Sequence, residues 1–340
     1  MENFSVPDNP LNTGNQSSTE TPLIIPPKPM ADEPKSRTNV WLRSASSLAL
    51  YLVLGYYIFH SFEMLLLITA IVVFHELGHF LAMKAFRYKD LGIFFIPLLG
   101  AYVSGSKREV SQKESAIILL AGPLPGVILG VVLYLLYKYN PDLSVAGISF
   151  YTVSILLILL NIINLIPVYP LDGGQLLNRV FLNEESWVSK VFVFLSAAFL
   201  CWVALFASSP PFYLLLLFPA MMLLRLFGDS KLNNVEKKVE ASGINLDRSY
   251  DELTDEDYWK IRNILIEEHP SFKEIPPSPP FEYDAREEKI KTTIESLLHR
   301  HLIQDVSIAG KIFILLIWIA AFAAPWLLKM DMSFFHRFGF

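Results

Sequence analysis

The sequence has little charge and one cysteine. Asp, Glu, Lys and Arg together make up 18% of its 340 residues, whereas soluble domains are closer to a quarter charged. Cys201 is the single cysteine, so the chain cannot form an internal disulfide and no oxidising compartment is indicated. The net charge is -5 and the sequence contains no basic tract, which argues against a nucleic-acid partner.

Apolar residues, in contrast, make up 53% of the chain and gather in blocks. A helix needs about 20 apolar residues to cross a bilayer, and these blocks have about that length. The blocks cover residues 40–59, 62–86, 115–137, 148–168, 187–207, 211–227 and 309–328. Their number predicts an all-α polytopic (multi-pass) membrane bundle with about six or seven transmembrane helices.

Residues 91–105 are apolar as well, but Gly92, Pro97 and Gly100 interrupt them. Irregular backbone at membrane depth must be buried in protein or line a wet cavity, because lipid offers no hydrogen-bond partners. We therefore expect short strands here, forming a small membrane-associated β-sheet against the helices.

The remaining composition divides the chain into four parts. Residues 1–38 are polar and proline-rich, lack the apolar run of a secretory signal, and are expected to form a disordered tail. Residues 39–227 form a membrane-embedded core with six spans. Residues 228–307 are a polar segment of helices and proline-rich linker, and residues 308–340 hold the final transmembrane helix and a short tail.

Basic residues near the spans predict the orientation. Lys and Arg flank the first block and fill the loops after the second, fourth and sixth blocks, whereas the alternate loops have little beyond Lys138. Cytoplasmic loops carry this excess of positive charge. The N-terminus and residues 228–307 are therefore predicted to be cytoplasmic, with the final span resting on the weakest pattern.

The second block contains the five residues His-Glu-Leu-Gly-His, from His75 to His79. Two histidines at i and i+4 project from one helix face, so both imidazoles can reach one zinc ion. Glu76 then lies beside the metal and can act as the general base of a hydrolytic reaction. The alternative is a charged helix surface, but apolar residues flank this motif, and titratable groups inside a span are costly and usually functional.

A catalytic zinc ion needs three protein ligands and an open position. Among the membrane blocks, Asp172 is an isolated acid at the end of the fourth. The Asp-Gly pair that it begins is also common in solvated turns, and by itself it would favour a turn. However, the second and fourth blocks are predicted to run in the same direction, which brings Asp172 and the histidine pair to similar depth.

The motifs HELGH at 75–79 and NLIPVYPLDGG at 164–174 resemble those of the site-2 protease family of intramembrane zinc metalloproteases. The resemblance covers residues 62–177. It implies a catalytic core of three spans with zinc held by His75, His79 and Asp172, and with Glu76 as the base.

The resemblance further implies that Asn164 lies near the substrate, where its amide can steady the scissile carbonyl or its oxyanion. The alternative for Asn164, and more so for Asn161, is an interhelical hydrogen bond. Two positions depart from the family's usual pattern: Gly100-Ala101 stands where a Gly-Gly pair is common, and Gly126 stands where asparagine is common.

The predicted activity is endoproteolysis of a membrane-protein substrate with a transmembrane helix, in the lipid bilayer, with one Zn²⁺ per chain. A membrane zinc protease that processes prenylated proteins is one alternative, although that class takes its third ligand from a downstream glutamate. A transporter or a catalytically inactive scaffold is another. The sequence does not indicate an oligomeric state.

Overall fold

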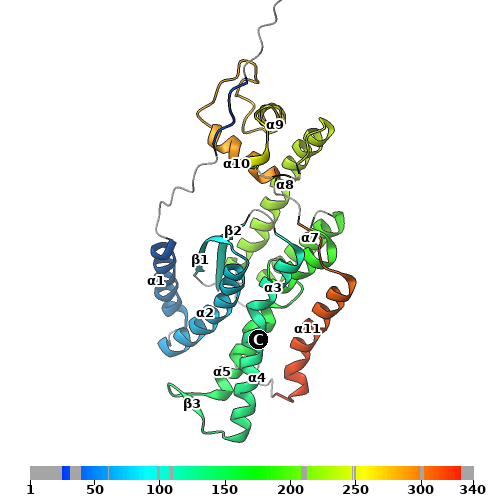
Figure 1. Ribbon diagram of the computed structural model, residues 1–340. Coiled ribbons are helices and arrows are strands. Elements are labelled where there is room, and N and C mark those ends of the chain that lie inside the picture. The colour runs from blue at the N-terminus through cyan, green and yellow to red at the C-terminus, as the bar shows by residue number, and fades with distance from the viewer. Residues whose placement is uncertain are drawn as a thin grey trace, which may run out of the picture.

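The computed structural model describes most of the chain and is mainly helical (Figure 1). Its description covers residues 25–30, 40–59, 61–97, 100–107, 110–184, 186–207, 213–246, 248, 250–298 and 302–330. The other residues, including most of the expected tail at 1–38, lie outside the described part.

The apolar blocks of the sequence form helices. They are α1 (Val40–Phe59), α2 (Phe62–Ala85), α3 (Gln112–Ala121), α4 (Pro123–Tyr139), α5 (Phe150–Asn164), α7 (Trp187–Phe206), α8 (Leu217–Ala241) and α11 (Ile308–Leu327). Gly122 and Pro123 separate α3 from α4, since a proline inside a continuous helix would remove a hydrogen bond. The helix α8 continues past the expected end of its apolar block at 227 and extends into the polar segment.

Four helical segments within the described residues are long and apolar enough to cross a membrane, as expected for an integral membrane protein. They are Phe62–Ala85, Gln112–Tyr139, Trp187–Phe206 and Ile308–Leu327. Phe150–Asn164 and Tyr213–Leu224 are apolar but shorter. The last block of the sequence, which carried the weakest orientation signal, is therefore one of the candidate spans.

The interrupted segment after α2 forms the expected small sheet. Strand β1 (Lys89–Ile96) pairs antiparallel with β2 (Gly100–Ser106), with Phe95 opposite Ala101. This hairpin packs between α1 and α2 (Figure 1). A second hairpin of two-residue strands, β3 (Ser144–Val145) and β4 (Ile148–Ser149), precedes α5.

The chain reverses after α5 through a short irregular stretch and then forms α6 (Asp172–Leu176), followed by a π-helix, η1 (Leu177–Leu182). Pro167 and Pro170 prevent α5 from continuing. The indole nitrogen of Trp318 on α11 donates to the carbonyl oxygen of Leu165 at 2.8 Å, which ties the last span to this turn.

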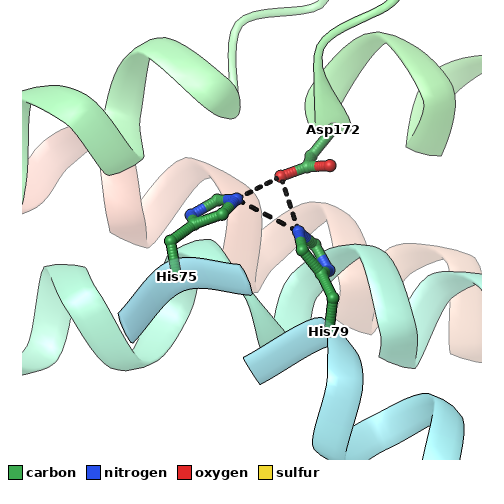
Figure 2. A group of neighbouring side chains, drawn as sticks. All are labelled: His75, His79 and Asp172. Carbon is green, nitrogen blue, oxygen red and sulfur yellow. Dashed lines mark hydrogen bonds and ion pairs between the residues drawn. The ribbon is translucent and has the colours of Figure 1, made fainter. Parts of the chain in front are cut away.

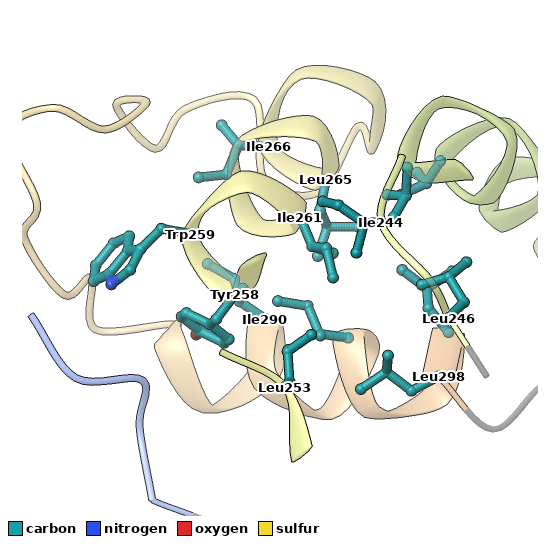
Figure 3. Close-up of a cluster of buried hydrophobic side chains, with 14 of the residues drawn as sticks. Ile244, Leu246, Leu253, Tyr258, Trp259, Ile261, Leu265, Ile266, Ile290 and Leu298 are labelled. Atoms are coloured by element: carbon teal, nitrogen blue, oxygen red, sulfur yellow. The ribbon is translucent and has the colours of Figure 1, made fainter. Parts of the chain in front are cut away.

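The polar segment that follows the sixth apolar block is a small folded unit. It contains the second half of α8, a 3₁₀ turn η3 (Tyr250–Glu252), α9 (Asp255–Glu268) and α10 (Glu287–Leu298). Thr254 caps α9 by accepting a hydrogen bond from the backbone N–H of Asp257, as its sequence indicates. These elements bury a hydrophobic cluster of their own, centred on α9 and α10 (Figure 3).

Residues 25–30, the described part of the tail that was expected over 1–38, lie against this unit. Ile25 packs beside its hydrophobic cluster, and four backbone carbonyls of the segment accept hydrogen bonds from the unit. Disorder was expected over 1–38 because few of these residues are apolar. The contacts of residues 25–30, however, are made largely by backbone atoms, which composition does not describe.

Candidate metal centre

His75 and His79 project from one face of α2, one turn apart, and both are buried (Figure 2). Their Nε2 atoms lie 3.1 Å from each other. The spacing expected from the HELGH motif is therefore realised, since i and i+4 side chains lie one above the other on a helix.

Asp172 reaches the two histidines from the first residue of α6. Its Oδ2 atom lies 3.1 Å from Nε2 of His75 and 3.2 Å from Nε2 of His79 (Figure 2). A close backbone approach makes this possible: a Cβ on Gly173 would lie 1.9 Å from the carbonyl oxygen of Leu165. Glycine at 173 thus lets the turn after α5 fold tightly onto α6.

The other ring nitrogen of each histidine has a hydrogen-bond partner that fixes the ring. Nδ1 of His75 lies 2.8 Å from Oδ1 of Asn161, whose amide nitrogen donates to the carbonyl oxygen of Leu157 at 2.7 Å. Nδ1 of His79 lies 2.7 Å from the carbonyl oxygen of Ile118. Both partners accept hydrogen bonds, which assigns the proton of each ring to Nδ1 and leaves Nε2 as the atom that faces Asp172.

This donor set is compatible with a zinc ion. Zinc binds imidazole nitrogen and carboxylate oxygen at about 2.0–2.2 Å, so tetrahedral ligand atoms lie about 3.3–3.5 Å apart. The three ligand atoms here are separated by 3.1 to 3.2 Å. Among the described residues, His75, His79 and Asp172 are the group of metal-ligating side chains that meets in this way.

A pocket opens beside His75, one of the three converging side chains. Glu76, which is buried at 6% exposure, and Asn164 both line it. The pocket also touches residues of α2, α5 and β2, namely Ile71, Val72, His75, Gly100, Ala101, Leu160 and Asn161. The amide nitrogen of Asn164 donates one of its two hydrogens to the carbonyl oxygen of Leu160 at 3.1 Å.

Two glycines of the third block allow this close packing. A Cβ at Gly122 would lie 2.3 Å from Nε2 of His79, and a Cβ at Gly126 would lie 2.2 Å from Nδ2 of Asn161. The departure at Gly126 therefore has a physical role, because the amide of Asn161, coming from α5, occupies the space beside it.

The sequence analysis brought together His75, Glu76, His79, Asp172 and Asn164, and all five lie at one site. It gave too little weight to Asn161, which is fully buried and holds the first histidine. A usable signal was present: Asn161 and Asn164 are three residues apart, so they share a helix face in an otherwise apolar block.

Comparisons with known proteins found similar sequences over part of the chain. Residues 63–142 match the model of Peptidase family M50. The chain is 30% identical over 126 residues to a zinc metalloprotease of Methanocaldococcus jannaschii, covering 37% of this chain and 36% of that protein. It is also 30% identical over 122 residues to stage IV sporulation protein FB of Bacillus subtilis, covering 35% of this chain and 41% of that protein.

A solved structure, the site-2 protease from Methanocaldococcus jannaschii, shares 24% identity with this chain at a TM-score of 0.40, covering 53% of this chain and 84% of that one. The curated relatives are matched over well under half of their lengths. Over the matched region, the resemblance to the site-2 protease family is confirmed.

Proposed function

We propose that this chain is an intramembrane zinc metalloendopeptidase that hydrolyses peptide bonds of membrane-protein substrates within or beside the bilayer. The observation that carries the proposal is the convergence of His75, His79 and Asp172, with both histidine rings held in the tautomer that a metal requires. Titratable side chains that meet in an apolar helix bundle are costly unless they have a function.

His75, His79 and Asp172 would hold one zinc ion. A bound zinc ion lowers the pKa of water and polarises a carbonyl oxygen. Glu76 is the neighbour that moves the proton: its carboxylate accepts a proton from the attacking water and delivers it to the leaving nitrogen, so that the peptide bond is broken as a C–O bond forms.

The pocket gives a place for the scissile peptide. Asn164 faces it from α5, while Gly100 and Ala101 face it from β2. In this proposal the Asn164 amide gives up its bond to the carbonyl of Leu160 and donates to the substrate oxyanion as it forms. A substrate segment that unwinds from a transmembrane helix would then present an extended chain beside the sheet.

The proposed topology follows the basic-residue pattern. The core at 39–227 contributes six spans, α11 contributes the seventh, and the N-terminus and the unit formed by 228–307 are cytoplasmic. The helix α5, which is short as a span, packs against α2 and α4, and its Asn161 contacts His75, whereas α8 packs against α7.

The test is metal-dependent cleavage by purified protein in liposomes, with a reporter whose transmembrane helix carries a fluorophore on each side. We expect about one zinc ion per chain, loss of cleavage after chelation, and recovery on adding zinc. Cleavage that persists in metal-free protein would reject the proposal. A prenylated soluble peptide as substrate tests the alternative protease class.

A further inference from the structure

The folded unit of residues 232–298 carries a binding surface on the outside of its hydrophobic cluster. The cluster is formed by residues that are at most 5% exposed, including Tyr250, Tyr258, Trp259, Ile261 and Ile290 (Figure 3). Trp259, Tyr250 and Tyr283 direct their polar atoms outwards from this base, towards residues 25–30.

Residues 25–30 read Ile-Pro-Pro-Lys-Pro-Met. Three prolines fix the backbone dihedral φ near -65°, and each residue that precedes a proline favours an extended conformation. Such a segment loses little conformational freedom when it binds, and its carbonyl groups remain open because no internal hydrogen bonds form. It is drawn as the dark blue ribbon beside Trp259 in Figure 3.

Aromatic side chains of the unit donate hydrogen bonds to the carbonyl groups of this segment. The indole nitrogen of Trp259 donates to Pro26 O at 2.9 Å, and the Tyr250 hydroxyl donates to Pro29 O at 2.9 Å. The Tyr283 hydroxyl donates to the carbonyl of Pro27.

A lysine on the unit continues the row of donors: Nζ of Lys291 donates to Met30 O at 2.8 Å. Four of the six carbonyl groups are therefore recognised without use of a proline side chain.

The side chain of Lys28 makes polar contacts with the unit. Its ammonium group donates to the carbonyl oxygens of Tyr250, Asp251 and Leu253, so the three N–H donors meet three acceptors on and directly after the turn η3. The same ammonium lies 5.1 Å from the centre of the Tyr250 ring, a distance at which a cation is attracted to an aromatic face. The backbone N–H of Lys28 donates to Oδ1 of Asp255 at 2.8 Å.

The surface is held in place from behind. Arg262, at 1% exposure, forms a buried ion pair with Glu287 at 2.8 Å, and its guanidinium lies 4.8 Å from the Trp259 ring centre. The Tyr258 hydroxyl donates to the same carboxylate at 2.6 Å, and burial beside that anion raises the pKa of Tyr258, which keeps it a donor. The guanidinium of Arg262 thus contacts the face of the Trp259 indole from within the unit.

The front of the surface is open. Tyr283 is 51% exposed and Met30 is 89% exposed, so the segment lies on the surface of the unit and is not enclosed by the core. A segment held by backbone carbonyls, one caged lysine and an aromatic platform matches the way in which proline-rich peptides are recognised by aromatic-lined grooves.

We propose that this surface is a binding site for proline-rich peptides of the pattern apolar-Pro-Pro-Lys-Pro, and that residues 25–30 are its resident ligand. The site is independent of the proposed protease activity. Because the resident segment belongs to the same chain, its effective concentration is high, and a partner's peptide binds only when it competes with that segment.

The experiment uses the full chain in detergent and a fluorescent peptide of residues 20–33 as the probe, with binding followed by anisotropy. The variant Pro26→Ser, Pro27→Ser, Lys28→Ser, Pro29→Ser weakens the resident ligand. We expect this variant to bind the probe saturably and at least about tenfold more tightly than the wild type.

Two further changes show whether binding uses the described contacts. Adding Tyr250→Phe and Tyr283→Phe to the four-serine variant removes two donors while keeping both rings, and should weaken binding at least about fivefold. Tyr139→Phe, at a residue 94% exposed on α4, is the matched control and should change nothing. A probe with Lys28→Arg should bind poorly, because a planar guanidinium does not fit the ammonium cage.

Absence of saturable binding by the four-serine variant with its helical content intact would overturn the proposal. Equal binding with and without the two tyrosine hydroxyls would overturn it too. If the four-serine variant loses helical content, the single variant Lys28→Ser replaces it: this variant should bind the probe more tightly than the wild type, and equal binding by the two proteins would reject the proposal.

Discussion

Nδ1 of His75 lies 2.8 Å from Oδ1 of Asn161, a residue 86 positions later on another helix. The Asn161 amide cannot rotate without losing its bond to the carbonyl of Leu157. One asparagine thus holds the ring of the histidine that we propose as a metal ligand, a role that such outer partners often have.

Asn161→Leu should therefore weaken metal binding without changing a ligand. Leucine has a similar volume but accepts no hydrogen bond, so the His75 ring is free to rotate. Losses of such partners typically cost about 10- to 100-fold in metal affinity or activity. Competition with a chromophoric chelator measures zinc affinity, and Ile163→Leu, at a residue 40% exposed on the same helix, is the control. Unaltered zinc affinity in Asn161→Leu would remove this role from Asn161.

Gly122→Ala should disturb the metal centre through a steric clash, without replacing any of the three proposed ligands. The new Cβ would lie 2.3 Å from Nε2 of His79, so the ring or the α3–α4 junction must move. A displacement beyond about 0.5 Å is poorly tolerated at such sites, and we expect zinc content and cleavage to fall together. Gly310→Ala is the control, because its Cβ would lie 3.1 Å from a flexible valine side chain. Full zinc content in Gly122→Ala would show that the site accommodates the methyl group.

Asp172→Ala should abolish cleavage and markedly lower zinc per protein, while expression and helical content persist. Asp172→Glu should also be poor, because the longer side chain displaces the carboxylate by about one methylene. Elemental analysis beside the reporter assay measures both quantities. If Asp172 were only a turn residue, Asn would replace it with little harm. Full zinc and full cleavage in Asp172→Asn would place the third ligand elsewhere.

The proposed orientation is tested with single cysteines in a Cys201→Ser background. Ser106, Asp142 and Ser242 are all exposed, so burial does not protect them. With an impermeant thiol reagent added outside intact cells, Asp142→Cys should be labelled, whereas Ser106→Cys and Ser242→Cys should react only after lysis. Labelling of Ser242→Cys in intact cells would reverse the topology.

Much of the fold and the site could be predicted from the sequence because membrane spans and metal ligands leave local patterns. The apolar blocks became helices, glycine and proline marked the hairpin at 89–106, and the spacing of His75 and His79 placed both rings on one face. Apolar length alone does not fix the number of spans, since α5 and α8 are shorter or more polar than a full crossing.

Contacts between segments far apart in the chain could not be predicted from the sequence. Asn161 could be recognised as a partner of His75 only once α2 and α5 were seen to pack together. The docking of residues 25–30 was equally hidden, because Lys28 finds its carbonyl cage more than 200 positions later in the chain. Composition describes such a proline-rich stretch as disordered and carries no information on its partner.

The most direct test of the central claim is Glu76→Gln. Glutamine keeps the shape of the side chain but cannot accept the proton of water, while the three ligands remain unchanged. Purified Glu76→Gln in liposomes should hold as much zinc as the wild type and should cleave the transmembrane reporter at least about 10²- to 10⁴-fold more slowly. Cleavage near the wild-type rate, with zinc retained, would contradict the assigned chemistry.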